Sequence, residues 1–207
     1  SPLLVGIAAS RMFNLASLDV SVAAMAAFLL RQPVTVMVKA YSGRRPRTDL
    51  PAARFWFALY GLIAALALVG AILPGRGYLL YLAAPGLPVF AWHLWLVSRR
   101  SERRAIYVEV IATGVLSLAA PAAYWTGIGR YDPTGWWLWL LSWLQTSASI
   151  VYAYLRLEQR ELDSPPDSKS LWVMGRRALI YTSFNFALTL ILGRIRILPQ
   201  LIFVPFL

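Results

Sequence analysis

The only histidine of the chain, His93, is the residue whose chemistry most directly suggests a bound cofactor. It lies in the apolar segment Phe90-Ala91-Trp92-His93-Leu94-Trp95. A neutral imidazole can be an axial ligand to the metal of a haem or chlorophyll, with Trp92 and Trp95 packed on the macrocycle. However, Arg99 follows six residues later, about 9 Å along a helix, so a histidine near the membrane surface could simply bond to headgroups or water. We expect no metal bound by this chain alone; pigment, quinone or lipid could bind at its lipid-facing surface.

Polar side chains recur at helical spacing in two other apolar runs, 135–155 and 178–193. They are Ser142, Gln145, Thr146 and Ser149 in the first run, and Thr182, Asn185 and Thr189 in the second. Spacings of three and four residues place each set on one face of a helix. Consecutive antiparallel helices can join such faces through interhelical hydrogen bonds, and we prefer this interpretation to a polar ligand pocket.

Two prolines and a glycine, Pro85, Gly86 and Pro88, interrupt the apolar run 78–97. Proline removes a backbone donor and kinks a helix. Carbonyl groups freed within a membrane must face protein or a cavity. The pattern therefore indicates either a ligand or transport site or a kink that is packed against neighbouring helices.

The acidic residues do not form the motifs of a known membrane enzyme class. Magnesium-dependent diphosphate chemistry needs two acid-rich motifs, but the sequence has a single cluster, formed by Glu158, Glu161, Asp163 and Asp167. It has no phosphate-binding glycine loop, nucleophile elbow or His-Glu zinc motif. Asp19 and Glu109 lie in or near apolar runs and could relay protons, although pairing with arginine explains them as well. We therefore expect a protein that is not an enzyme.

The elements that position these residues are long apolar runs. Of the 207 residues, 59% are hydrophobic and only 14% are charged, against about 25% in soluble domains. A helix crosses the membrane core with about 20 apolar residues. The sequence predicts an all-α, polytopic transmembrane helix bundle in one domain, 1–207, that we expect to be truncated at both ends. Its six full spans are 15–30, 55–73, 78–97, 105–125, 135–155 and 178–193, with partial spans at 1–10 and 197–207.

The basic residues predict the orientation of this bundle. Fifteen of the 20 lysines and arginines lie in the loops 31–54, 98–104 and 156–177, which the positive-inside rule places in the cytoplasm. The net charge of +11 could suggest nucleic acid, but basic clusters between apolar runs favour the membrane surface instead. Anionic lipid heads could contact Arg44, Arg45, Arg47, Arg99, Arg100, Arg103 and Arg104. Arginine outnumbers lysine strongly, which is typical of GC-rich bacteria, so we expect a multi-pass protein of the bacterial cytoplasmic (inner) membrane.

Several strings resemble the YwiC-like family of bacterial integral membrane proteins. They include Arg31-Gln32-Pro33, His93-Leu94-Trp95-Leu96, Ala120-Pro121-Ala122-Ala123-Tyr124-Trp125, and longer segments within 135–160 and 175–185. Together these strings cover nearly the whole chain. Members of the family typically begin with a Glu-His-Gly-Ala-Trp motif, which the resemblance implies would precede Ser1. The number of spans is similar to that of membrane prenyltransferases, which is an analogy of fold only.

The sequence therefore favours a non-catalytic accessory or scaffold subunit of a larger membrane complex. Its expected partners are membrane lipids and other integral membrane subunits. A tryptophan-rich surface that faces lipid would suit a bioenergetic or photosynthetic assembly with pigments or quinones. The alternative is a prenyltransferase-like enzyme or lipid-handling protein, followed by a small-solute transporter.

Overall fold

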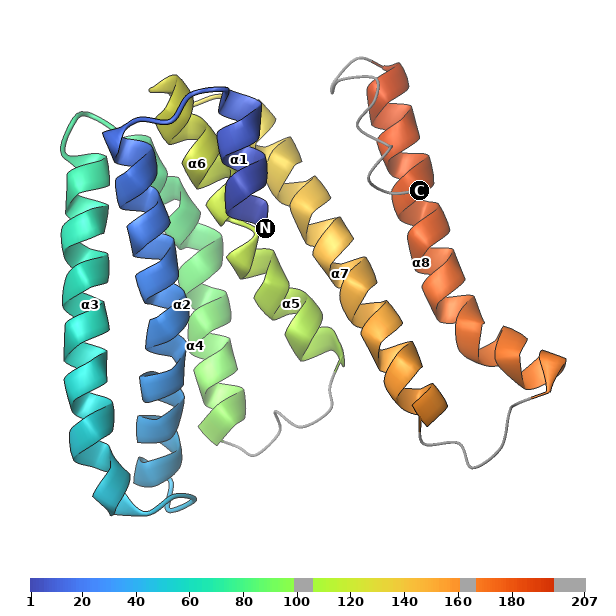
Figure 1. The fold of residues 1–207 in the computed structure, drawn as a ribbon, viewed down its shortest axis with the longest axis horizontal. Helices are drawn as coiled ribbons and strands as arrows, with labels where there is room; N and C mark the ends of the chain where they lie inside the picture. Colours follow the sequence, from blue (N-terminus) through green and yellow to red (C-terminus); the bar gives the residue numbers. More distant parts are fainter. Residues whose placement is uncertain (99–105, 161–166, 196–207) are drawn as a thin grey trace.

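The computed structural model describes residues 1–98, 106–160 and 167–195, and every regular element within them is helical (Figure 1). The predicted all-α class is therefore confirmed. The elements are α1 (Pro2–Ser10), α2 (Leu15–Tyr41), η1 (Arg47–Asp49), α3 (Leu50–Ile72), η2 (Gly77–Leu82), α4 (Ala83–Ser98), α5 (Ile106–Leu116), α6 (Ala119–Ile128), α7 (Thr134–Arg160) and α8 (Ser168–Arg194).

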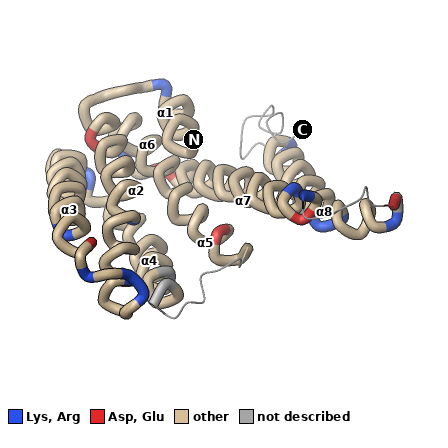
Figure 2. The backbone as a smooth tube through the Cα atoms, turned by 60° about the horizontal axis from the view of Figure 1, so that its bottom comes forward, with Lys and Arg blue, Asp and Glu red and all other residues tan. Residues whose placement is uncertain are grey.

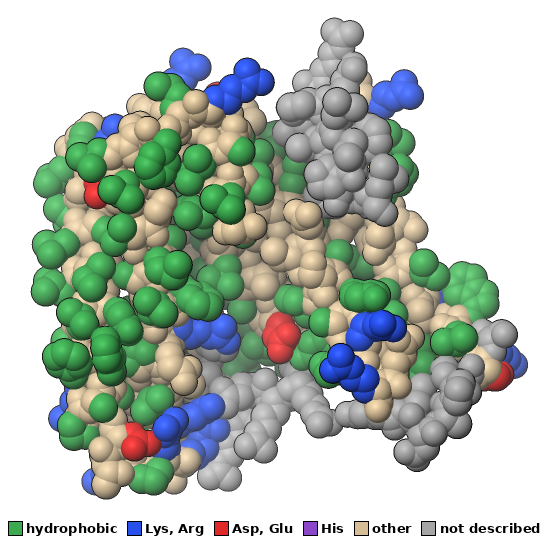
Figure 3. Space-filling model, viewed as in Figure 1, with side chains coloured by type: hydrophobic (Ala, Val, Ile, Leu, Met, Phe, Trp, Pro, Cys, Tyr) green, Lys and Arg blue, Asp and Glu red, His purple; other side chains and the backbone are tan. Residues whose placement is uncertain are grey.

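Among the described residues, four helical segments are long and apolar enough to cross a membrane: 15–41, 47–72, 77–96 and 106–128. Large hydrophobic side chains are exposed along α3, such as Phe55, Leu62 and Leu66. Hydrophobic side chains also cover the face formed by α2 and α3 (Figure 3). In water such a surface would be unfavourable, whereas lipid solvates it, so the chain is a membrane protein. The six spans predicted from the sequence exceed these four by the runs that form α7 and α8.

The helices stand side by side, with α3 at one edge of the bundle and α8 at the other (Figure 1). Helices α1, α5 and α6 lie between α2 and α7. The connections α1–α2, α3–η2 and α6–α7 lie at one end of the bundle. At the opposite end lie the α2–α3 connection, the last residues of α4 and α7, and the first residues of α5 and α8. The described ends of the three basic loops therefore share one end of the molecule, as a serpentine chain requires.

Helix α2 continues well beyond the end predicted at residue 30. Pro33 removes the backbone donor that would bond to the carbonyl of Leu29, yet the helix runs through it to Tyr41. The stretch 34–38 after the proline is apolar except for Thr35, and the whole of 15–41 qualifies as a candidate membrane span. Arg31 is consequently a residue of a helix rather than of the loop 31–54.

The run 105–125, predicted as one span, is interrupted between α5 and α6. Pro121 has no N–H to donate to the carbonyl of Ser117, so that carbonyl accepts a bond from the Ala120 N–H at 3.0 Å. The turn at Ser117 and Leu118 is buried, and the Ser117 hydroxyl donates to the carbonyl of Thr113 at 2.8 Å. The interruption is therefore buried in the bundle, and after it α6 packs against α1.

Four tryptophans of α6 and α7 pack against one another in a column. Trp125 is fully buried. Ring centroids lie 5.5 Å apart for Trp125 and Trp136, 6.0 Å for Trp136 and Trp139, and 5.2 Å for Trp139 and Trp143. The indole N–H groups of Trp139 and Trp143 donate to the carbonyls of Gly114 and Val110 in α5. These rings therefore pack within the bundle. The exposed indoles are those of Trp56, Trp95 and Trp172, so the expected lipid-facing tryptophan surface stays a prediction.

Candidate ligand groove

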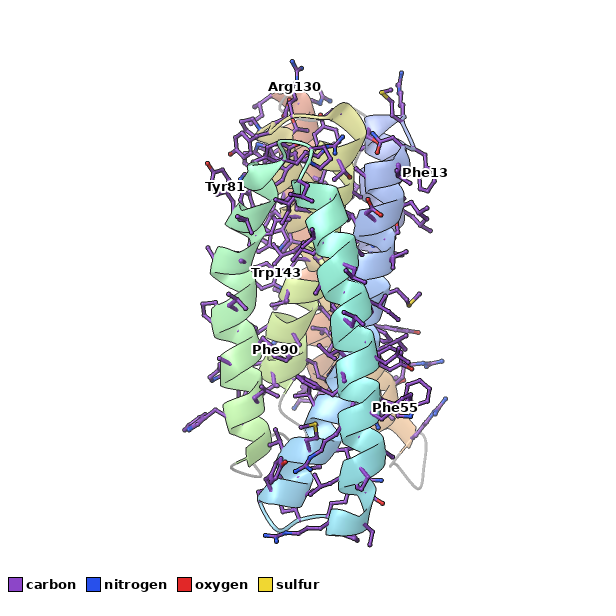
Figure 4. All side chains as sticks on the ribbon, turned by 90° about the vertical axis from the view of Figure 1, so that its left-hand side faces the viewer. Phe13, Phe55, Tyr81, Phe90, Arg130 and Trp143 are labelled. Carbon is purple, nitrogen blue, oxygen red and sulfur yellow. The ribbon has the colours of Figure 1, made fainter. Side chains whose placement is uncertain are left out.

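An apolar groove of about 500 Å³ lies between α2, the η2–α4 segment and the α5–α6 segment. Its lining also includes Leu68 of α3. Along α2 the lining extends from Val20 to Arg31, and along α4 it ends at Phe90. Phe90 of α4 lies below Tyr81 of η2 in Figure 4, nearer the end of the bundle that holds the α2–α3 connection.

Small side chains open the groove. Helix α2 contributes Ala23, Ala24 and Ala27, while α5 and α6 contribute Ala112 and Ala119. Larger residues at these positions would bring their side chains into the groove and fill it. Gly86 of α4 also lines the groove, and a Cβ there would lie 3.7 Å from Cδ1 of Leu118 across it. The space exists because alanine and glycine residues of three separate helical segments face it.

Arg31 is the one charged residue among those that line the groove. Its backbone carbonyl accepts a bond from the Thr35 hydroxyl, one helical turn later in α2, at 2.8 Å. In the described ranges, no carboxylate forms an ion pair with its guanidinium. The Arg31 side chain is exposed, and an arginine at the border of an apolar cavity is a candidate binding residue, because its charge needs an anion or water.

The part of α4 around Pro88 borders the same space. Pro88 lies inside α4 and leaves the carbonyl of Ala84 without its usual helical donor. Gly86 and Val89, on either side of this point, line the groove. The sequence left open whether Pro85, Gly86 and Pro88 mark a ligand site or a packed kink; they lie in a helix that forms one wall of the groove.

The two tryptophans beside His93 do not belong to the groove. His93 belongs to α4, but its side chain is outside the described part of the structure. The rings of Trp92 and Tyr107 lie 6.4 Å apart, joining α4 to α5, and the Trp95 side chain is exposed. Neither tryptophan lines the groove, so the expected axial ligand and its packing partners stay a prediction.

The two polar sets meet only in part. Asn185 of α8 is buried, and its amide N–H donates to the backbone carbonyl of Leu144 in α7 at 3.0 Å. Thr189 is buried and bonds to carbonyls of its own helix. Ser142 is also buried, with no hydrogen-bond partner for its hydroxyl among the described residues.

The remaining members of these sets do not join the helices. The side chains of Gln145, Ser149 and Thr182 are exposed, and the Ser149 hydroxyl bonds to the carbonyl of Gln145 within α7. Gln145 is not the partner of Asn185, because Asn185 donates to the α7 backbone directly. Helical spacing places residues on a common face but does not say which part of the neighbouring helix that face meets.

The predicted lipid-contacting arginines fall into two groups. Arg44, Arg45 and Arg47 lie in the α2–α3 connection, where Figure 2 shows basic residues gathered. Arg45 forms an ion pair with Asp49, and Arg44 bonds to the hydroxyl of Ser42. The second group, Arg99, Arg100, Arg103 and Arg104, lies outside the described residues. Within the described ranges, no three His, Cys, Asp or Glu residues gather as a metal site.

The fold defines a helical membrane protein with an apolar groove between its helices. The model of one protein family, described as YwiC-like protein, matches residues 1–124, which is more than half of the chain. The chain therefore belongs to the YwiC-like family. All residues that line the groove fall inside the matched range, whereas the similar strings in α7 and α8 lie beyond it. No curated protein and no solved structure matched the chain.

Proposed function

We propose that this protein is a lipid-handling protein that holds one apolar chain of a lipid-like molecule in the groove. The observation that carries the proposal is the groove itself, about 500 Å³ lined by alanine, leucine, valine and phenylalanine. Pockets that hold small molecules have volumes of about 300–1,000 Å³ and mostly apolar walls. An apolar chain would replace membrane lipid there while gaining contacts with three helical segments at once.

We also propose that α7 and α8 cross the membrane, so that the chain has six full spans in a bacterial cytoplasmic membrane. Each of the two helices has 27 residues, or about 40 Å at 1.5 Å per residue, against a core of about 30 Å. Their mean hydropathy is lowered by charged residues near the loops, such as Arg160 and Arg177, and by polar groups that pack inside the bundle, such as Thr189. The basic loop ends then face the cytoplasm.

The lipid-binding proposal is tested with a photoreactive diazirine dodecanol added to the protein in detergent micelles. Labelling of groove residues should saturate and be competed by unlabelled dodecanol, whereas labelling of the outer surface should rise in proportion to the probe. Ala24→Phe fills the groove and should reduce the saturable labelling several-fold. The matched control is Ala65→Phe, on the exposed face of α3. Labelling that never saturates, or that is unchanged by Ala24→Phe, would overturn the proposal.

The accessory-subunit function is the second candidate, and the position of α8 favours it. Helix α8 packs mainly on α7 and stands at the edge of the bundle (Figure 1). The α7–α8 contact contains the buried side-chain oxygen of Asn185, Oδ1, which has no hydrogen-bond partner in the described residues. A neighbouring subunit against these helices would bury more of their surface. Co-purification of one partner at a fixed ratio from native membranes supports this function, and isolation as a stable single chain contradicts it.

A further inference from the structure

The groove has an apolar body and one charged end. Of the 21 residues that line it, 20 are apolar and the remaining one is Arg31. The two acids in the neighbouring spans, Asp19 of α2 and Glu109 of α5, are not among the lining residues. A ligand that fits this distribution has one apolar chain and one polar head.

Arg31 lies at the end of the groove nearest the basic loops. The groove follows α2 from Val20 to Arg31, about 16 Å at 1.5 Å per residue. Ten residues of helix, about 15 Å, then separate Arg31 from the end of α2 at Tyr41. Arg31 therefore lies deeper than Arg44, Arg45 and Arg47 of the α2–α3 connection, and a chain in the groove would point from Arg31 toward the opposite surface.

The chemistry of arginine selects the head group. A guanidinium remains charged in any environment and presents a planar fork of donors that matches a phosphate or carboxylate with two parallel bonds. No carboxylate of the described chain neutralises Arg31. We propose that the groove binds a single-chain amphiphile with an oxyanion head group, phosphate or carboxylate, and that Arg31 bonds to that head. This inference rests on the proposed lipid-binding function and names its ligand class.

The test uses competition for the saturable diazirine-dodecanol site by three dodecyl compounds: dodecyl phosphate, dodecanoate and dodecanol. The two anions should compete at concentrations about tenfold lower than the alcohol, the effect of one charge-assisted hydrogen bond. Arg31→Gln should remove this difference and leave competition by dodecanol unchanged, which also shows that the variant is folded. Arg31→Lys should retain part of the preference, because the charge remains without the fork.

The matched control is Arg47→Gln, an exposed arginine of the α2–α3 connection that does not line the groove. It should keep the full preference for anions; loss of the preference in this variant would mean that general surface charge, rather than Arg31, attracts the head group. The ratio between dodecyl phosphate and dodecanoate identifies which oxyanion the groove prefers. Equal competition by anions and alcohol at a saturable site would overturn this inference alone, whereas the absence of a saturable site would overturn the proposed function.

Discussion

The indole N–H of Trp125 donates a hydrogen bond of 2.7 Å to the backbone carbonyl of Asp132, and the Trp125 side chain is fully buried. This bond ties α6 to the loop that leads into α7. Tyr78 of η2 packs on the same ring with centroids 6.2 Å apart and donates from its hydroxyl to the Trp125 carbonyl at 3.3 Å. One residue thereby joins three elements at the end of the bundle opposite the basic loops.

Trp125→Phe should lower the free energy of unfolding by about 2 kcal/mol. The change removes one hydrogen bond and leaves a small cavity around the shorter ring. Reversible unfolding in mixed detergent micelles, followed by circular dichroism, measures the effect. The control is Trp56→Phe, because Trp56 is exposed on α3 and its ring contacts are with Phe55 and Tyr60 of the same helix. Equal effects of the two substitutions would show that burial of the Trp125 indole contributes little.

Gly6→Ala should destabilise the contact between α1 and α6 by about 1–3 kcal/mol, the usual cost of overpacking. A Cβ on Gly6 would overlap the backbone carbonyl oxygen of Ala120, which cannot move without displacing α6. The matched control is Gly61→Ala in the interior of α3, where no atom lies within 4 Å of the added Cβ. That change should be neutral or stabilise by up to about 1 kcal/mol, because alanine favours helix. Thermal unfolding of both variants measures the two effects. A loss of stability only in Gly61→Ala would contradict the close contact between Gly6 and Ala120.

Asp132→Asn should weaken the dependence of stability on acidity. The hydroxyl and backbone N–H of Thr134 bond to the Asp132 carboxylate and hold its pKa below the usual value, helped by the nearby charge of Arg130. Because the folded pKa is depressed, this carboxylate stabilises the fold above its unfolded pKa of about 4, and the contribution is lost as pH falls through the folded pKa.

Unfolding midpoints measured from about pH 6 down to about pH 3 test this linkage. The wild type should lose stability more steeply than Asp132→Asn over this interval. Thr134→Val, which keeps the backbone donor and removes the hydroxyl, should behave in between. Parallel acid profiles for wild type and Asp132→Asn would show that the carboxylate has the same pKa in the folded and unfolded chains.

Asn185→Leu should cost about 0.6 kcal/mol, the average for a polar contact between membrane helices. The lost bond to the Leu144 carbonyl is partly offset, because the Asn185 Oδ1 has no partner among the described residues and leucine removes that buried oxygen. Gln145→Leu should have no measurable effect, since the Gln145 side chain is exposed. Reversible unfolding of the two variants gives the comparison. A larger loss of stability in Gln145→Leu than in Asn185→Leu would show that Gln145 takes part in the contact between α7 and α8.

The helices of this chain were predictable because lipid demands long apolar runs. The run 55–73 corresponds to α3, and the run 78–97 to η2 and α4, within a few residues. The end of α2 was missed because Pro33 and Arg31 both resemble a helix boundary in the sequence. The apolar stretch after Pro33 was the signal that the helix continues, since a loop would not need it.

The groove could not be predicted in the same way, because it arises from long-range packing. Ala24 and Ala112 are ordinary membrane residues in the sequence, and only the arrangement of their helices places them around one space. Gly86 and its neighbouring prolines were the one local signal, and a packed kink explained them equally well. Tryptophans near span ends are ambiguous for a related reason: such a ring can face headgroups or, like Trp125, bond to a carbonyl across a turn.

Single cysteines should reveal the orientation of the bundle, since the chain has none of its own. We expect Arg45→Cys and Arg160→Cys to be protected from an impermeant thiol reagent in intact cells, and Arg76→Cys and Arg130→Cys to react. The basis is the basic residues of the loops 31–54, 98–104 and 156–177, whose described ends lie at one end of the bundle. Permeabilised cells are the control, because all four sites should then react. Reaction of Arg45→Cys in intact cells would show that the topology is the inverse of the predicted one. Protection of Arg130→Cys alone would mean that the α6–α7 loop is covered.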